Sequence, residues 1–191
     1  IHKTSGSFFV LGELFTSLEL PFDQATTKHC GSCSACIDIC PTQAIVEPYL
    51  LDARKCIAYL TIEFQGIIPE ELRRGIGNRV FGCDDCQLIC TWNSFAKTTP
   101  IDDFNPRHGL DDIQLIDLWQ WDENTFMTNT EGSPLRRTGY QSFMRNVAIG
   151  LGNAPFSDEI LQQLQASRPE LNDIVQVHID WATKEQLMKK H

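Results

Sequence analysis

All eight cysteines of this chain fall into two runs whose spacing suits iron–sulfur chemistry. The first run has intervals of three, three and four residues, and a proline follows its last member: Cys30, Cys33, Cys36 and Cys40. The second run has one cysteine, a long insertion and then three closely spaced members: Cys56, Cys83, Cys86 and Cys90. Bacterial proteins bind two 4Fe–4S clusters with this spacing. The sequence therefore predicts a protein that moves single electrons, with no cysteine left for another purpose.

We expect each cluster to take its fourth ligand from the other run. Three closely spaced cysteines wrap one cube, and the cysteine before the proline crosses to the other cube because the short loop lacks the reach to cap its own. Pro41 fixes a backbone angle that turns the chain between the two sites, whereas Thr91 stands at the equivalent place in the second run. The expected ligands of cluster 1 are Cys30, Cys33, Cys36 and Cys90. Those of cluster 2 are Cys56, Cys83, Cys86 and Cys40.

Zinc and disulfide bonds are the competing uses of these cysteines. Structural zinc sites favour two separated pairs of cysteines, and the evenly spaced first run fits that pattern poorly. Disulfides need an oxidising compartment, and no signal peptide is visible, although the sequence begins at Ile1 and not at methionine. Zinc ranks behind the clusters, and disulfides rank behind zinc. We expect His29, beside Cys30, to be hydrogen-bonded or solvated, because the cysteines already complete both clusters.

Length and charge limit the classes of partner. The chain has 191 residues, of which 42% are hydrophobic, so it can bury a core, and no apolar run approaches the roughly 20 residues that span a bilayer. Its net charge of −9 means that any RNA surface must be a local basic cluster. We expect a cytoplasmic monomer without a membrane partner. Two basic clusters exist, each with a solvated helix face as the simpler interpretation: Arg73, Arg74 and Arg79, and Arg136, Arg137 and Arg145.

We divide the chain into four parts. Residues 1–28 are the end of a truncated domain, 29–97 the two-cluster domain, 98–132 a linker and helical segment, and 133–191 a helical module. This order predicts an α+β fold in which a two-cluster bacterial ferredoxin-like domain precedes a HEAT-like α-helical module. In the first part, we expect the apolar stretch 8–20 to be a buried strand and turn or a short helix.

Hydrophobic periodicity and capping residues locate the helices. The segment 56–63 is β-branched and aromatic, and its composition is compatible with helix or strand. We expect Trp119, Trp121 and His178 to be packing residues. Helices are expected from Pro69 to Gly75 or Gly77, over 110–127, over 140–151 with a stop before Pro155, from the capping residue Ser157 onward, and from Pro169 onward.

Three stretches together resemble one enzyme family. They are CGSCSACIDICPTQAI from Cys30, CIAYLTIE from Cys56 and IGNRVFGCDDCQLICTWN from Ile76. The combination closely resembles the epoxyqueuosine reductases, cobalamin-dependent enzymes that complete queuosine in the tRNA anticodon. The segment SPLRRTGYQSFMRNVAIGLGN from Ser133 is similar to the helical tRNA-contacting module of that family, and GSFFVLGELFTSLELP from Gly6 is similar to the end of its cobalamin domain.

The resemblance implies roles for individual residues. It implies that most of the cobalamin-binding half, with the catalytic acid of the family, lies outside this chain, so we expect no catalytic residue here. Ala58 stands where the family has a serine. The residues implied on the cobalamin side are Leu11, Ala58, Cys83 and Asp84. Those expected to contact RNA are Glu63, by the resemblance, and Arg136, Arg137 and Arg145, from the basic helical segment.

The resemblance also implies a mechanism that suits the residues. Opening an epoxide to an alkene consumes two electrons and protons, and no amino-acid side chain supplies electrons. Two 4Fe–4S clusters would pass electrons singly from a low-potential donor to cobalamin, while the protein positions and tunes these cofactors. Two alternatives stay open at this point: a stand-alone electron-transfer ferredoxin module with a helical docking tail, and a relative of the reductive dehalogenases.

Overall fold

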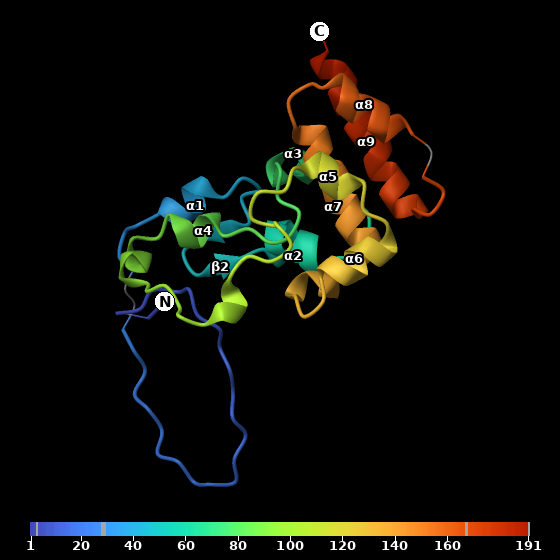
Figure 1. Cartoon of the computed structure of the whole chain (residues 1–191). Coiled ribbons are helices and arrows are strands. Elements are labelled where there is room, and N and C mark those ends of the chain that lie inside the picture. The colour runs from blue at the N-terminus through green and yellow to red at the C-terminus, as the bar shows by residue number, and fades with distance from the viewer. Residues whose placement is uncertain (3, 28–29, 167, 191) are drawn as a thin grey trace.

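The computed structural model describes residues 1–2, 4–27, 30–166 and 168–190, so His29 lies outside the described residues. Figure 1 shows a small part around α1, α4 and β2 beside a larger stack of helices that ends at the C-terminus, and a long N-terminal loop that extends away from both. The α-helices are α1 (Ala35–Ile39), α2 (Ile57–Ile62), α3 (Glu70–Ile76), α4 (Asp85–Leu88), α5 (Leu115–Trp119), α6 (Glu123–Asn129), α7 (Tyr140–Asn153), α8 (Asp158–Gln165) and α9 (Asp173–Lys189). The 3-10 helices are η1 (Ala53–Lys55), η2 (Thr91–Phe95), η3 (Asp102–Phe104) and η4 (Pro134–Thr138).

The sheet found in the described residues is one short hairpin. Strand β1 (Ile45–Glu47) pairs antiparallel with β2 (Leu50–Leu51), and Ile45 lies opposite Leu51. Tyr49 turns the chain between the strands with a φ of 69°, in the left-handed region. The fold is therefore mostly helical with a small two-stranded sheet, and the expected α+β class holds only in that limited sense.

One hydrophobic core joins the helical stack to the long insertion within the second cysteine run, between Cys56 and Cys83. Helix α7 packs along α9 and also contacts α2, α3, α5 and α6. The core includes Ile57 and Leu60 of α2 and Ile76 of α3, together with the buried face of α7. It thus crosses the boundary that we expected between residues 97 and 98. The helical module is well packed, and its identity as a HEAT-like repeat stays a prediction.

Polar side chains of α7 hold the ends of two other helices. The Arg145 guanidinium is fully buried and donates to the carbonyls of Leu60 at 2.7 Å, Phe64 at 2.7 Å and Gly66 at 2.9 Å. Asn146, also fully buried, accepts from Arg145 at 3.0 and 3.1 Å. These bonds satisfy carbonyl groups that the last turn of a helix and the following loop leave without partners.

The same pattern continues along α7. The Asn146 amide donates to the carbonyls of Thr61 and Val80, both at 2.8 Å. At the last residue of α7, the Asn153 amide donates to the carbonyls of Arg73 at 2.8 Å and Gly77 at 3.0 Å, at the end of α3. Because buried carbonyls need partners, α7 can pack only where α2 and α3 present these groups.

The buried histidine fits its expected packing role. His178 of α9 is fully buried, and its Nε2 accepts from the Ile68 amide at 3.2 Å, while its Nδ1 lies 2.6 Å from the Ile174 carbonyl. Burial lowers the pKa of His178 to about 4, and the nearby positive charges of Arg73 and Arg145 act in the same direction. The imidazole is therefore neutral at pH 7 and joins α9 to the loop before α3.

Several expected elements are confirmed. Helix α7 ends at Asn153 before Pro155, the Ser157 hydroxyl accepts from the Ile160 amide at the start of α8, and α3 begins directly after Pro69. The segment after Cys56 is a helix, which resolves that ambiguity. Trp119 and Trp121 are buried core residues, as expected.

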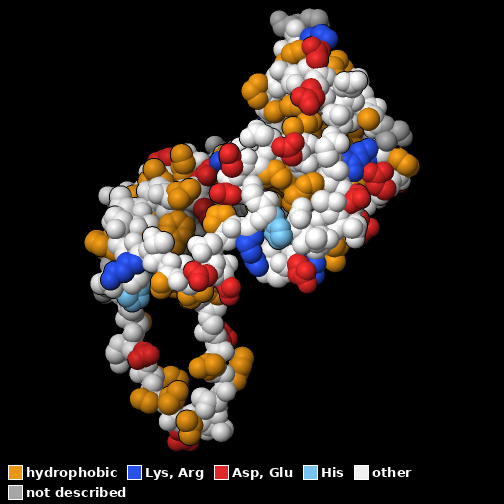
Figure 2. All heavy atoms as spheres, viewed as in Figure 1, with side chains coloured by type: hydrophobic (Ala, Val, Ile, Leu, Met, Phe, Trp, Pro, Cys, Tyr) orange, Lys and Arg blue, Asp and Glu red, His pale blue; other side chains and the backbone are white. Residues whose placement is uncertain are grey.

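Three expectations are wrong. The stretch 8–20 is neither strand nor helix, and Leu14 is 97% and Phe15 95% exposed. Figure 2 shows hydrophobic side chains along the extended N-terminal loop, with no described element packed against them. The expected helix over 110–127 consists of two short helices, since the Asp122 carboxylate caps the amide of Thr125 and starts a new helix. The last helix begins at Asp173, not at Pro169, because Asn172 supplies its N-terminal cap.

The Arg145 network generates a stability prediction. Replacing Arg145 with methionine keeps much of the volume but leaves the Leu60, Phe64 and Gly66 carbonyls without donors. We expect Arg145→Met to lower the free energy of unfolding by roughly 3–5 kcal/mol, measured by urea unfolding followed by circular dichroism. Arg145→Lys should recover only part of this, because an ammonium lacks the planar fork of donors.

The matched control is Arg137→Met, since Arg137 is exposed and its loss should leave stability close to the wild-type value. Equal midpoints for Arg145→Met and Arg137→Met would contradict the role that we assign to the buried guanidinium.

Candidate iron–sulfur site

Short helices and turns present the cysteines of both runs to a common region. The Cys33 amide donates to the Cys30 carbonyl at 3.1 Å in a turn before α1, and Cys40 is the C-cap of that helix. Cys56 is the N-cap of α2, and Cys90 is the N-cap of η2. Helices α1 and α4 lie in contact, so the first run meets the end of the second.

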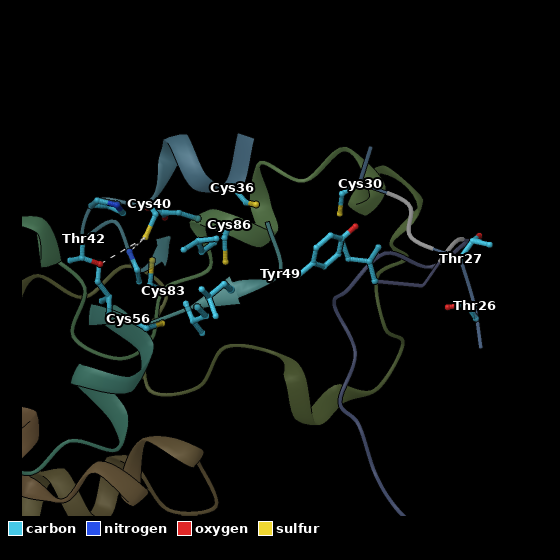
Figure 3. A pocket seen from close by; sticks show the side chains of 18 residues that line it. Thr26, Thr27, Cys30, Cys36, Cys40, Thr42, Tyr49, Cys56, Cys83 and Cys86 are labelled. Carbon is cyan, nitrogen blue, oxygen red and sulfur yellow. Dashed lines mark hydrogen bonds between the residues drawn. The ribbon is translucent and has the colours of Figure 1, made fainter. Parts of the chain in front are cut away.

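Six of the cysteines line one cavity of about 620 Å³. The hairpin residues Ile45, Tyr49 and Leu51 form part of its wall, together with Ala44 and Ile57. Figure 3 shows the sulfurs of several of these cysteines turned toward the space between α1, α4, β2 and α2. An apolar cavity rich in thiols fits a group with several soft metal ions. The cysteines that line it are Cys30, Cys36, Cys40, Cys56, Cys83 and Cys86.

The surroundings of Cys36 identify one group of sulfurs. Burial raises the pKa of the Cys36 thiol, and negative charge on Cys30, Cys33 and Cys90 adds to that effect. These four cysteines are the ligands expected for cluster 1, and Cys90 comes from the second run. Their proximity supports the crossed assignment, which stays a prediction.

The remaining cysteines interact in a second group. Burial raises the pKa of Cys86, and negative charge on Cys83 and Cys56 raises it further, with a smaller effect from Cys36. Burial also raises the pKa of Cys83, and Cys40 is among the charges that add to it. This group matches the ligands expected for cluster 2. Cys36 acts on Cys86 as well, so the two groups are neighbours.

Cys40 has a different environment from the other partly buried cysteines. The amide of Ala44 donates to Cys40 Sγ at 3.3 Å, and Thr42 Oγ1 lies 3.8 Å from the same sulfur. Burial raises the pKa of Cys40, but the amides of Ala44 and Ile45 together with Thr42 outweigh it, so the pKa is lowered. The turn after Pro41 therefore stabilises a thiolate at this position.

The other uses of cysteine find less support in the structure. All eight cysteines are free, so the disulfide alternative is wrong. Across residues 1–2, 4–27, 30–166 and 168–190, no group of three or more histidine, cysteine, aspartate or glutamate side chains is arranged to hold a single metal ion. The sulfurs surround a shared cavity, as ligands of clusters larger than one ion would.

The residues implied on the cobalamin side lie on different segments of the described chain and differ in exposure. Leu11 is 85% exposed in the N-terminal loop, and Asp84 is exposed beside α4. Ala58 lies on α2, partly buried. Of the four implied residues, Cys83 lines the cavity. Their role at a corrin stays a prediction.

The residues expected to contact RNA separate into two groups. Glu63 at the end of α2 and Arg137 of η4 form an exposed ion pair, and Arg136 donates to the Met127 carbonyl at the surface. Arg145 is fully buried, so the expectation that it contacts RNA is wrong. It lies on the inner face of α7, where its guanidinium binds backbone carbonyls and cannot reach a phosphate.

The other basic cluster is also engaged within the protein. Arg73 is buried and donates to the Ile68 carbonyl at 2.9 Å. Arg74 pairs with Glu185 of α9 at 2.9 Å, and Arg79 pairs with Asp85 of α4 at 2.6 Å. The simpler interpretation, a solvated helix face, is therefore wrong for Arg73, and the Arg74–Glu185 pair connects α3 to α9 of the helical stack.

Sequence reasoning missed the residues that surround the cysteines. Thr42, which is 7% exposed, and the hairpin residue Tyr49 line the cavity but carry no motif of their own. Thr42 has one recognisable signal, a hydroxyl two residues after a ligand and directly after Pro41. Tyr49 has none, because its position depends on the left-handed turn of the hairpin.

A search of the part of the chain that the structure describes finds no helix long and apolar enough to cross a membrane.

Comparisons with known proteins agree with the cysteine pattern. Residues 29–93 match the model of a 4Fe-4S double cluster binding domain. Over 185 residues, the chain is 55% identical to the epoxyqueuosine reductase of Pseudomonas aeruginosa, covering 96% of this chain and 51% of that protein. The chain spans about half the length of the curated relatives that it matches.

Two solved structures share the fold. Epoxyqueuosine reductase from Bacillus subtilis, solved with its catalytic loop swung out of the active site, is 28% identical with a TM-score of 0.76, over 87% of this chain and 45% of that one. An epoxyqueuosine reductase solved with an epoxyqueuosine-modified tRNA-Tyr stem loop is 23% identical with a TM-score of 0.66, over 86% of this chain and 52% of that one.

The site geometry predicts the metal content. After anaerobic reconstitution, the chain should hold about eight irons, four for each cluster. Cys40→Ala should remove the cluster that otherwise depends on Cys56, Cys83 and Cys86, leaving about four irons. The measurement is iron and sulfide content with visible absorbance, and a matched control is Ser94→Ala, which leaves every cysteine in place. Stoichiometric zinc without the absorbance of an iron–sulfur protein would contradict the assignment.

Proposed function

Since the chain is homologous to the C-terminal half of the epoxyqueuosine reductases, we propose that it serves as that half of such an enzyme, which reduces epoxyqueuosine to queuosine at the wobble position of tRNA. The observation that carries the proposal is the thiol-lined cavity on a chain 55% identical to such an enzyme. In this role the chain is part of an oxidoreductase. It supplies the electron path and part of the RNA surface.

The electron path is the first element of the proposal. When bound, two 4Fe–4S clusters carry single electrons and cobalamin delivers them to the epoxide. The chain holds the cluster ligands at helix ends and turns, where backbone amides face the sulfurs. Cys33 is exposed and belongs to cluster 1, which is therefore the side where a low-potential donor would deliver electrons.

The cobalamin side is the second element. Cys83 lines the cavity from the direction of α4, and Asp84 beside it is exposed, so this edge is open to a further domain. The exposed apolar loop with Leu11 would pack against the same domain. Within this chain we place no catalytic acid, and proton delivery to the substrate would come from the other half of the enzyme.

The RNA surface is the third element. The relative solved with a tRNA stem loop shares the fold over 86% of this chain. Arg136 and Arg137 lie on η4, and Glu63, paired with Arg137, lies at the far end of the α2 helix that starts at Cys56. A base that enters between these residues would approach the side of α2 that leads to cluster 2. Phosphate contacts of exposed arginines are sensitive to salt.

A joined chain tests the proposed activity. We expect this chain alone to bind cobalamin weakly and to leave epoxyqueuosine in tRNA unchanged. Joined to the N-terminal half of the Pseudomonas aeruginosa relative, it should bind cobalamin and convert epoxyqueuosine to queuosine, measured by mass spectrometry of digested tRNA. The control is the joined chain with Cys56→Ala, which lacks one cluster ligand and should lose turnover while retaining cobalamin.

Tight cobalamin binding by residues 1–191 alone would show that the cofactor site is misplaced. A joined chain that binds cobalamin and holds both clusters but leaves tRNA unmodified would favour the stand-alone electron-transfer alternative.

The arginine surface generates a separate prediction. Arg136→Glu with Arg137→Glu should weaken binding of a tRNA anticodon stem loop to the joined chain at least tenfold. Each lost phosphate contact should reduce the slope of log affinity against log salt by somewhat under one unit. The measurement is fluorescence anisotropy at several salt concentrations.

The charge-matched control is Arg54→Glu with Lys55→Glu, on η1 near the first cysteine run, which should leave affinity and slope close to wild type. An unchanged salt slope in the Arg136 and Arg137 variant would mean that η4 is a packing element and not an RNA surface.

A further inference from the structure

The two cysteines that end the runs differ in what surrounds their sulfurs. Cys40 Sγ accepts from the Ala44 amide at 3.3 Å, and the Thr42 hydroxyl lies 3.8 Å away, as the dashed line in Figure 3 marks. A metal-bound cysteine sulfur carries no proton, so the hydroxyl must be the donor. Cys40 therefore receives one backbone donor and one side-chain donor, in addition to any metal ions.

The turn that provides these donors is fixed by its sequence. Pro41 restricts its own φ, and Gln43 adopts a φ of 51°, in the left-handed region, while its amide donates to the Cys40 carbonyl at 3.1 Å. The chain thereby doubles back over the sulfur. Thr42 is 7% and Ala44 1% exposed, so water does not compete with their contacts to the sulfur.

The second run ends in a different way. After Cys90 the chain enters η2, and the Asn93 amide donates to the Cys90 carbonyl at 2.9 Å. The Asn93 side chain binds the N-terminal segment instead, where its carbonyl oxygen accepts from the Ser7 amide at 2.6 Å. Thr91, the hydroxyl residue beside Cys90, is exposed. The polar groups of the turn after Cys90 therefore form hydrogen bonds with the backbone and with Ser7.

Hydrogen bonds to cysteine sulfurs are among the factors that set the reduction potential of an iron–sulfur cluster. Reduction adds negative charge to the cluster, and a donor aimed at a ligand sulfur stabilises that charge. The donor pair at Cys40 should therefore favour the reduced state of whichever cluster Cys40 holds.

We propose that Thr42 and the turn from Pro41 to Ala44 raise the reduction potential of the cluster bound by Cys40, so that it is the more easily reduced of the two. This inference rests on the proposed function, in that it needs both clusters and the crossed ligands. The higher reduction potential of the cluster bound by Cys40 would favour electron transfer toward that cluster. With both clusters bound, an electron that enters at cluster 1, beside the exposed Cys33, would move to cluster 2, beside Cys83 and the proposed cobalamin edge.

The test is potentiometric titration of the reconstituted chain, followed by electron paramagnetic resonance. Thr42→Val removes the hydroxyl and keeps the shape of the side chain. We expect a several-fold decrease in the reduction equilibrium constant of one cluster, where a tenfold decrease equals a shift of 59 mV for one electron, and no change in the other. Thr42→Ser keeps the hydroxyl and should titrate like the wild type.

Two controls identify the affected cluster. Thr91→Val makes the same change beside Cys90 and should shift neither potential. Cys56→Ala removes a ligand of cluster 2, so adding Thr42→Val to it should leave the potential of the surviving cluster unchanged. Thr42→Ala, which is smaller than threonine, replaces Thr42→Val if the valine variant fails to take up about eight irons.

Each failure has a distinct meaning. Unchanged potentials in a fully loaded Thr42→Val or Thr42→Ala chain overturn the role of Thr42, as does a Thr42→Ser chain that shifts as far as the valine variant. A shift of the cluster that survives Cys56→Ala overturns the assignment of Thr42 to cluster 2. A wild-type chain without two clusters overturns the proposed function, and this inference with it.

Discussion

The buried guanidinium of Arg145 is the interaction on which the rest of the structure depends. Taking a charged group out of water is costly unless hydrogen bonds replace its hydration, and here three backbone carbonyls and the Asn146 side chain supply them. Burial lowers the pKa of Arg145 to about 10, so the group remains charged at pH 7. No carboxylate is among its bonded partners, and the charge is instead dispersed over carbonyl dipoles at the end of α2. These dipoles point their negative ends at a cation, as the C-terminus of any helix does.

One short helix, α2, connects the hydrogen bonds of Arg145 to the candidate site. Helix α2 begins directly after Cys56 and ends near Glu63, so one end carries a cysteine of the candidate site and the other is held by Arg145 and Asn146 of α7. The packing of the C-terminal helices therefore fixes the orientation of a cysteine more than 80 residues earlier in the chain. The expected boundary at residue 97 misses this, because α2 and α3 belong to the cluster segment by sequence and to the α7 core by packing.

Predictions from the sequence were correct where the spacing of neighbouring residues determines the structure. Cysteine spacing identifies the clusters because a cube needs ligands at fixed intervals, and the period of α7 identifies its buried face. Predictions from the sequence were wrong where a contact between residues far apart in the chain determines the structure. Arg136, Arg137 and Arg145 look alike as a basic cluster, but Arg145 lies on the face of α7 that meets α2, and no linear pattern records where those carbonyls are. The prediction that the stretch with Leu14 and Phe15 is buried was wrong for the opposite reason. An apolar stretch is buried only where another surface packs against it, and here none does among the described residues.

The same distinction bears on the RNA surface that we propose. An acidic protein repels phosphates at long range. To bind RNA, its exposed arginines must therefore stay accessible and must not form tight ion pairs with nearby carboxylates. Arg137 is 66% exposed while paired with Glu63, and an exposed pair of this kind contributes little to stability. If RNA binds at this surface as we propose, a phosphate would displace Glu63 at low cost, and the displaced carboxylate would become available to accept hydrogen bonds from a base. In this arrangement the ion pair keeps Arg137 in place in the free protein, and binding of the proposed RNA would release both partners. Arg145 could not serve this purpose, since removing its partners would break the core.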